Sequence, residues 1–522
     1  MPRRPKPKNT LSAGERVALY QAEQEEKQRR MREKSAEDRG ETLEAKPTEK
    51  AELVIDENAD VERKVKKSLP KPQHATVRVD FSIPVGEIKP MHGMCNGPVS
   101  YGADISGLFR EIGVPYVRFD GTDTAISSYA VDISRIFRHP EADPSDEKNY
   151  DFSCTDRYVE AAFLSGARVI FRLGESKDLF DGERNACISE DPDALSRVCV
   201  NVIRHYNDGW ASGYTYGISH FEIWNHDDSL SGRELEREFE MYRRLAGAVK
   251  LYDVSLLVGG MSFSGFGGAA REFLRMCKKT RAPMDFITVD CFGGNPEEVG
   301  GEAEQFVALM RNLGFADAEV IIGKWSYIDG EALGGQPLSR VLSGRGERFH
   351  EKRRLIFEAQ RSVQGAAYCA ALMLRLSQVS GINVSCFYDA QPMLSVWCAI
   401  SDRFGTPEKP FYAFKAFGEL YRARSGVFCD SEQVDGFAHT GVYAGAAVSD
   451  NGDGWVMLAS YGGCGIVDLR LDGIPDRFYS ADIYLLDGVK NLTLGDTAPI
   501  SGMKKRLLLN VSEYGVVLVK LY

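Results

Sequence analysis

One short stretch of the chain places several side chains capable of proton transfer or hydrogen bonding directly after an apolar run. Residues 220–224 (His-Phe-Glu-Ile-Trp) form a compact β-favouring segment, and Asn225, His226 and Asp227 follow it at once. A histidine can donate or accept a proton near neutral pH, and an asparagine can hold a hydroxyl group. In parallel α/β proteins, ligands lie at the carboxyl ends of strands, so this stretch predicts a site.

Eight strand-like runs, mostly separated by helical patterns, would position this stretch and others like it. Leu235, Phe239 and Tyr242, for example, have the spacing of one helical face after the fourth run. Eight strand–helix units predict a (β/α)₈ barrel. A doubly wound open sheet is the main alternative, but it needs a glycine-rich phosphate turn that Asn96-Gly97-Pro98 does not supply. The runs are residues 91–94, 116–119, 169–173, 220–224, 255–258, 285–289, 320–322 and 384–387.

Polar residues follow several of the other runs at the same relative position. If the runs are parallel barrel strands, these residues meet at one end of the barrel and share a site. They are Asp120 after the second run, Glu175 after the third, Asp290 after the sixth, Lys324 with Trp325 after the seventh, and Asp389 after the eighth.

Two regions of different character flank the predicted barrel, which spans residues 73–424. Residues 425–522 show short strands separated by hairpin turns such as Asn451-Gly452, which predicts an antiparallel β-sandwich. The alternating run at 76–81 lies outside the barrel count and is a candidate to join that sandwich. Residues 1–72 are rich in both charges and poor in large apolar residues, which favours a flexible arm over a docking helix or a nuclear signal.

Composition excludes several classes of partner. The formal net charge of −11 argues against a nucleic-acid partner. Eleven scattered cysteines without a C-x-x-C pair indicate reduced thiols rather than a disulfide frame or a zinc site. No run is long and apolar enough for a membrane span or a signal peptide, so we expect a cytoplasmic protein with no membrane partner, metal or cofactor. The sequence does not decide the oligomeric state.

Six motifs, taken together and in order, are similar to glycoside hydrolase family 39 of clan A, the family of β-xylosidases and α-L-iduronidases. The resemblance covers about residues 76–522. It implies a (β/α)₈ barrel, an accessory β-sandwich and retaining hydrolysis of a glycosidic bond. The motifs are Tyr116–Phe119, Tyr150-Asp151-Phe152, Phe221–Asn225, Gly259-Gly260, Pro283–Phe286 and Lys409–Phe414.

The chain departs from the family pattern at both catalytic positions. In clan A the acid/base glutamate follows an asparagine after the fourth strand, where this chain has Asn225 and then His226. The family's nucleophile belongs to a Glu-Trp pair after the seventh strand, where this chain has Lys324 and Trp325. Retaining hydrolysis needs two carboxyl groups about 5–5.5 Å apart.

Two further polar positions differ in the same region. The family has histidines after the second and sixth strands, and this chain has Asp120 and Asp290 there. A lysine ammonium about 4 Å from the cationic sugar ring of the transition state would oppose it by roughly 4 kcal/mol at an effective dielectric of 20. That corresponds to about a thousandfold in rate, so the ordinary retaining mechanism is not expected for Lys324.

Three interpretations stay open for a glycan partner. The first, slightly favoured, is a sugar-binding barrel without hydrolysis. The second is a glycosidase in which His226 donates the proton and a recruited carboxylate assists. The third, compatible with either, has Lys324 with Arg118 or Arg172 holding an acidic sugar such as a uronic acid. The candidate recruited residues are Asp120, Glu175, Asp227, Asp228, Asp290 and Asp389.

Structural roles compete with these functional ones. Arg118 and Glu222 can form a buried polar pair inside a barrel, and Trp325 fits a core position as well as a sugar-stacking one. A metal site at residues 226–228 is a minor alternative, because adjacent residues rarely all point one way. A non-catalytic interaction protein tethered by its arm is a further alternative, and an open, aromatic-lined cavity would favour a glycan instead. The predicted substrate-binding residues are Asn225, Asp120, Asp290, Trp325 and Asp389.

Overall fold

The structure of the chain is a computed structural model, and residues 70–522 form one compact unit. The predicted arm at residues 1–72 lies outside the residues that the structure describes, as do Asn225, His226, Asp227 and Asp228. The described ranges are 74–100, 103–120, 128–175, 191–223, 232–392, 397–433, 441–463, 465–476, 478–500 and 505–522.

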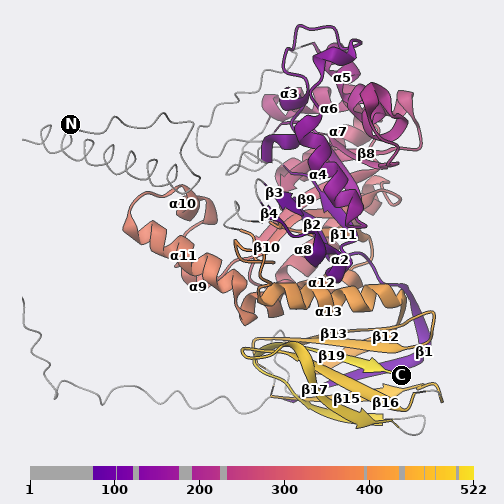
Figure 1. The fold of residues 1–522 in the computed structure, drawn as a ribbon, viewed down its shortest axis with the longest axis vertical. Coiled ribbons are helices and arrows are strands. Elements are labelled where there is room, and N and C mark those ends of the chain that lie inside the picture. Colours follow the sequence, from indigo (N-terminus) through magenta and orange to yellow (C-terminus); the bar gives the residue numbers. More distant parts are fainter. Residues whose placement is uncertain are drawn as a thin grey trace, which may run out of the picture. The chain divides into compact units, whose positions relative to one another are not determined.

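Eight parallel strands close into a barrel in the order β10-β11-β2-β5-β6-β7-β8-β9, as predicted (Figure 1). The fifth, sixth and seventh strands extend well beyond the predicted runs, because polar and glycine residues continue the ladder after the apolar pattern ends. The strands are β2 (Gly93–Cys95), β5 (Tyr116–Arg118), β6 (Arg168–Leu173), β7 (His220–Ile223), β8 (Leu257–Ser264), β9 (Phe286–Gly293), β10 (Glu319–Tyr327) and β11 (Ile382–Phe387).

Helices cover the outside of the barrel, and their ends follow ordinary capping chemistry. Helix α8 begins at Pro296 after Asn295, whose side chain accepts a hydrogen bond from the Glu297 amide, and it ends at a left-handed Gly314. The helices are α2 (Ser106–Ile112), α3 (Ile133–Ile136), α4 (Ser153–Leu164), α5 (Pro192–Asp208), α6 (Arg233–Tyr252), α7 (Gly268–Thr280), α8 (Pro296–Leu313), α9 (Gly330–Leu333), α10 (Leu338–Ser343), α11 (Glu347–Arg361), α12 (Val363–Gln378) and α13 (Lys409–Ala423).

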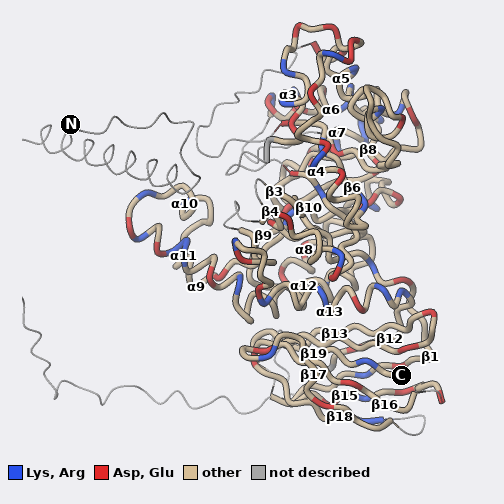
Figure 2. The backbone as a smooth tube through the Cα atoms, viewed as in Figure 1, with Lys and Arg blue, Asp and Glu red and all other residues tan. Residues whose placement is uncertain are grey.

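Helices α9, α10 and α11 are an insertion between β10 and α12 (Figure 1). Acidic and basic residues alternate along α11 (Figure 2), where Arg354 pairs with Glu351 and Glu358. The Arg353 guanidinium donates to the carbonyls of Val341, Leu342 and Gly344, so α11 holds the carboxyl end of α10 in place.

The C-terminal strands form one nine-stranded sheet that β1 (His74–Glu87) completes. Strand β1 pairs antiparallel with β12 and parallel with β15, so the run at 76–81 belongs to this sheet. Residues from strands near both ends of the sheet share one hydrophobic core, as expected for a sandwich. The other strands are β12 (Ser425–Gln433), β13 (Gly441–Val448), β14 (Gly454–Tyr461), β15 (Ile466–Asp472), β16 (Ser480–Leu486), β17 (Asn491–Pro499), β18 (Lys505–Asn510) and β19 (Tyr514–Leu521).

The sheet packs directly on barrel helices α12 and α13. Met457, Ala459 and Leu518 of the sheet belong to the hydrophobic core of the barrel. The Lys409 ammonium at the start of α13 donates to the carbonyl oxygen of Asp487 over 2.6 Å. Within the described ranges the cysteines are free thiols. No helix there combines the length and the apolar character that a membrane crossing requires.

The contact of α13 with α2 depends on Gly418. A Cβ atom at this position would lie 2.0 Å from the carbonyl oxygen of Ile112. We therefore expect Gly418→Ala to destabilise the protein by about 1–3 kcal/mol, measured as a lower urea midpoint of unfolding. Gly107→Ala, at an exposed position of α2, is the control, because a Cβ there meets no atom within 4 Å. Equal midpoints for the two variants would show that the helices do not meet at Gly418.

Candidate functional site

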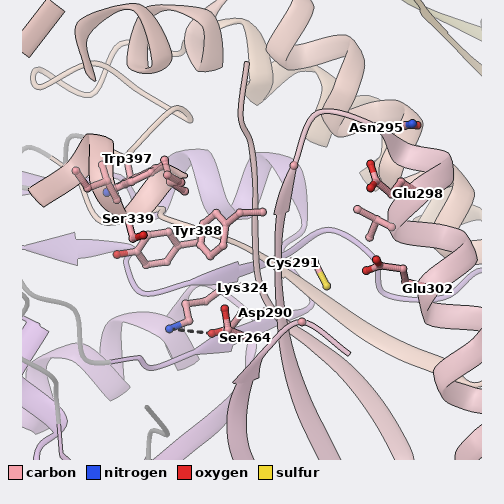
Figure 3. A pocket seen from close by; sticks show the side chains of 16 residues that line it. Ser264, Asp290, Cys291, Asn295, Glu298, Glu302, Lys324, Ser339, Tyr388 and Trp397 are labelled. Carbon is pink, nitrogen blue, oxygen red and sulfur yellow. Dashed lines mark ion pairs between the residues drawn. The ribbon is translucent and has the colours of Figure 1, made fainter. Parts of the chain in front are cut away.

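A cavity of about 710 Å³ opens at the carboxyl ends of strands β8 to β11, between the barrel mouth, α8 and α10 (Figure 3). Its floor contains Lys324 and Asp290, which the sequence placed in a site. Aromatic side chains form one wall, and two glutamates of α8 form another. The cavity therefore combines charged, polar and aromatic surfaces at the end of the barrel where ligands bind.

Lys324 is held between two aspartates. Its Nζ atom lies 3.0 Å from Asp120 Oδ2 and 3.0 Å from Asp290 Oδ2. Lys324 and Asp290 line the cavity, whereas the Asp120 side chain is fully buried beneath them. The structure thus brings together three of the predicted residues: Asp120 just after β5, Asp290 within β9 and Lys324 within β10.

A β-bulge at Gly323 turns Lys324 toward the cavity. Ile322 pairs with Val289 and Lys324 pairs with Asp290, so two residues of β10 oppose one residue of β9. A Cβ atom on Gly323 would lie 3.2 Å from Asp290 Oδ1, which favours glycine at this point. The extra residue places Lys324 beside Asp290 and turns Trp325 to the opposite face of the strand.

A second buried cation lies below this cluster. Arg118 Nε and Nη2 donate to the two carboxylate oxygens of Glu222 over 2.7 and 2.9 Å. Arg118 Nη1 also lies 3.5 Å from Asp120 Oδ1, and Nη2 donates to Ser262 Oγ over 3.0 Å. The Ser262 hydroxyl lies 3.0 Å from Asp290 Oδ2, so the two ionic clusters form one network inside the barrel.

The pKa values of the two aspartates are shifted in opposite directions. Burial raises the pKa of Asp290, and the cations Lys324 and Arg118 offset this only in part. Burial also opposes ionisation of Asp120, but Lys324, Arg118 and Arg172 outweigh it and lower the pKa of Asp120. Burial acts to lower the pKa of Lys324, yet the two carboxylates outweigh it, so the pKa is raised and the ammonium stays charged.

The aromatic wall consists of Phe292, Tyr388 and Trp397. Their ring centroids lie 5.8–6.0 Å from one another at steep angles, and Phe292 is 36% exposed. The Lys324 ammonium lies 5.9 Å from the centre of the Tyr388 ring, so the wall borders the charged floor directly. Phe292 and Trp397 were not among the residues predicted to form the site. Strand periodicity places Phe292 on the face of Asp290, but no pattern links Trp397 to the site.

The remaining predicted residues lie elsewhere. Trp325 is fully buried, and its ring stacks 5.8 Å from Phe414 of α13, so it is a core residue and does not line the cavity. Of the two roles that the sequence left open for Trp325, this placement supports the core role over substrate binding. Asp389 is buried and accepts hydrogen bonds from Asn96 Nδ2 over 3.4 Å and from the Gln391 amide over 2.9 Å. It does not line the cavity either.

Glu175, at the end of β6, forms a separate buried acidic cluster. Its carboxylate accepts hydrogen bonds from the amide and the hydroxyl of Ser134, over 2.7 and 2.6 Å. Burial and the nearby Asp132 carboxylate raise the pKa of Glu175 to about 7. Asp132 also forms an ion pair with Arg172, so Arg172 faces this cluster and is not free to hold a ligand carboxylate.

Comparison with known proteins supports the fold. No family model and no curated protein sequence matches the chain. The fold is similar to that of a glucosidase from Croceicoccus marinus, with a TM-score of 0.68 and 21% sequence identity, over 86% of this chain and 98% of that chain.

Two further structures extend this similarity. The GH39 enzyme from Xanthomonas axonopodis pv. citri gives a TM-score of 0.60 and 14% identity, over 87% of this chain and 99% of that one. A monomeric β-xylosidase from Caulobacter crescentus CB15 gives a TM-score of 0.58 and 14% identity, over 85% of this chain and 99% of that one. The family 39 resemblance is therefore confirmed at the level of the fold, which is that of family 39 enzymes and related glycosidases.

The Arg118–Glu222 pair yields a stability prediction. Arg118→Met leaves the buried Glu222 carboxylate uncompensated, and we expect a loss of about 3–5 kcal/mol in the free energy of unfolding. The double variant Arg118→Met/Glu222→Leu should regain much of that loss in urea unfolding. Arg354→Met, which breaks only exposed ion pairs on α11, should leave the midpoint nearly unchanged. A double variant no more stable than Arg118→Met would contradict the pairing.

The raised pKa of Glu175 predicts a pH dependence of stability. The folded protein binds this proton more tightly than the unfolded chain does, so the contribution of Glu175 is complete below its ordinary pKa of 4.5 and is lost as pH rises through about 7. Glu175→Gln removes this loss. Its stability relative to wild type should rise by on the order of 3 kcal/mol from pH 4.5 to 8. Exposed Glu141→Gln should run parallel to wild type, and parallel curves for all three proteins would exclude the shift.

Proposed function

We propose that this protein binds a glycan in the cavity at the ends of β8 to β11, and that it does not cleave glycosidic bonds by the ordinary two-carboxylate retaining mechanism. The observation that carries the proposal is an open cavity of about 710 Å³ in which Phe292, Tyr388 and Trp397 border the Lys324–Asp290 pair. An aromatic-lined opening is what distinguishes a glycan site from a barrel mouth filled by its own loops.

The chemistry of the cavity suits a sugar. Aromatic rings offer apolar faces on which the C–H groups of a pyranose ring can pack. The Asp290 carboxylate and the Lys324 ammonium can accept and donate hydrogen bonds to hydroxyl groups. Asp120, which is fully buried, serves this site by fixing Lys324 rather than by touching the sugar. Asn225 and His226 lie outside the described residues. Asn225 stays a candidate for holding a sugar hydroxyl, and His226 stays a candidate proton donor.

The missing nucleophile disfavours ordinary retaining hydrolysis more than the charge of Lys324 does. Lys324 stands where the resemblance implies the nucleophile, and an ammonium held by two carboxylates cannot attack a sugar. Because Asp120 and Asp290 offset its charge, the lysine opposes a cationic transition state less than an isolated ammonium would. What the site lacks is a carboxylate at position 324.

One observation favours a second function, a slow glycosidase that uses Asp290 as proton donor. Two carboxyl groups whose pKa values are shifted apart mark an acid and its ionised partner in many hydrolases. Here the pKa of Asp290 is raised and that of Asp120 is lowered, and only Asp290 lines the cavity. His226 would be an alternative donor.

We expect the purified protein to bind at least one member of a panel of gluco-, xylo- and arabino-oligosaccharides in titration calorimetry. Phe292→Ala should weaken that binding about tenfold, because it removes the most exposed ring of the wall. Phe163→Ala is the matched control, since this ring is 43% exposed on α4, which leads into the opposite end of the barrel. No binding across the panel, or equal weakening by both variants, would contradict the proposal.

The same panel tests hydrolysis. We expect no cleavage by wild type, and none by Asp290→Asn. Cleavage by wild type that Asp290→Asn abolishes would establish the second function, and cleavage that survives this change would point to residues outside the described cavity.

A further inference from the structure

We infer that the cavity selects sugars by charge: an amino sugar binds in preference to a neutral sugar, and a uronic acid is disfavoured. This inference rests on the proposed glycan binding and names the substrate class of the same site. It is the reverse of what a free lysine in the floor would give.

The Lys324 ammonium is already committed to anions within the protein. Two carboxylate oxygens lie 3.0 Å from Nζ, one from Asp120 and one from Asp290. An incoming uronate would have to displace one of these buried partners or share the remaining N–H with them. Displacement would cost Asp290 its ion pair and leave it with the Ser262 hydroxyl, or leave Asp120 with only the 3.5 Å contact to Arg118, and either loss is unfavourable for a buried carboxylate. Lys324 therefore does not act as an anion clamp.

The opposite wall adds two carboxylates for which the described residues show no ion pair. Glu298 and Glu302 lie one helical turn apart on α8 and both line the cavity (Figure 3). The described ion pairs of α8 involve Glu297 and Glu304, which bind Arg375 on another face of the helix. Glu298 and Glu302 are thus exposed carboxylates that face the ligand space.

The charge balance of the lining is negative. Lys324 is the single cation among the described lining residues, against Asp290, Glu298 and Glu302. The Phe292 ring, which is 36% exposed, also favours a cation through its face.

The test uses sugars matched in ring configuration and different in charge. Ligand-observed NMR at pH 6 and low salt would compare glucosamine, glucose and glucuronate, and separately galactosamine, galactose and galacturonate. In whichever ring configuration binds, we expect the amino sugar to bind most tightly, the neutral sugar less tightly and the uronate least. The affinities of the amino sugar and the uronate should differ by on the order of tenfold. The spread should shrink at 0.5 M salt, as exposed charges are screened (about 3 Å Debye length at 1 M).

Variants locate the effect. Glu298→Gln/Glu302→Gln should reduce the preference for the amino sugar about threefold or more, while binding of the neutral sugar persists. Asp317→Asn/Asp476→Asn changes the net charge equally at exposed sites outside the cavity and should leave the preference intact.

The outcomes separate the two claims. Binding in which the uronate is equal to or tighter than the amino sugar overturns the inference and leaves glycan binding standing. Equal loss of preference in both double variants overturns the assignment to α8. No binding by any sugar in any charge state, together with no binding of the oligosaccharide panel, overturns the proposed function and the inference with it.

Discussion

The contact between Lys324 and its two aspartates constrains the whole mouth of the barrel. Charges buried in a protein are tolerated only when they are paired and hydrogen-bonded. Nζ of Lys324, 3.0 Å from both Asp120 and Asp290, links β10 to β9 and to the residues that follow β5. Arg118 continues the network downward to Glu222 of β7. Each of these five groups is compensated by another, so none can be changed without unbalancing its neighbours.

This network also determines what the cavity can do. A lysine that is fully engaged in ion pairs stays charged and is a poor nucleophile, so the floor offers hydrogen bonds and a fixed charge rather than covalent chemistry. The functional surface is then set by what surrounds the floor: the aromatic wall and the carboxylates of α8. Selectivity for a ligand would come from these surfaces, while the buried ions keep them in place.

The sequence predicted the parts of this arrangement that depend on local pattern. The second, third, fourth and eighth strands coincide with their apolar runs. Asp120, Asp290 and Lys324 are in contact, as predicted for polar residues that follow the apolar runs of parallel strands. The bulge at Gly323 was not predicted, because the sequence of β10 does not show how closely Asp290 and Arg118 approach position 323. For the same reason the sequence left Trp325 undecided between core and cavity. Trp397 joins the site from a long connection, and no short-range pattern reports such a contact.

The departures from the family pattern at positions 120, 290 and 324 depend on one another. The family resemblance implies a glutamate after the seventh strand with histidines after the second and sixth, whereas this chain has a lysine with two aspartates. Because the three side chains are in direct contact here, a lysine in the centre requires anions on both sides, and a glutamate there would require cations or hydrogen-bond donors. Replacing Lys324 alone by glutamate would place three carboxylates together, with Arg118 as the nearest described cation. Such a cluster favours one protonated carboxyl, so a carboxylate at position 324 would compete with Asp120 and Asp290 for the ionised state unless those residues changed with it.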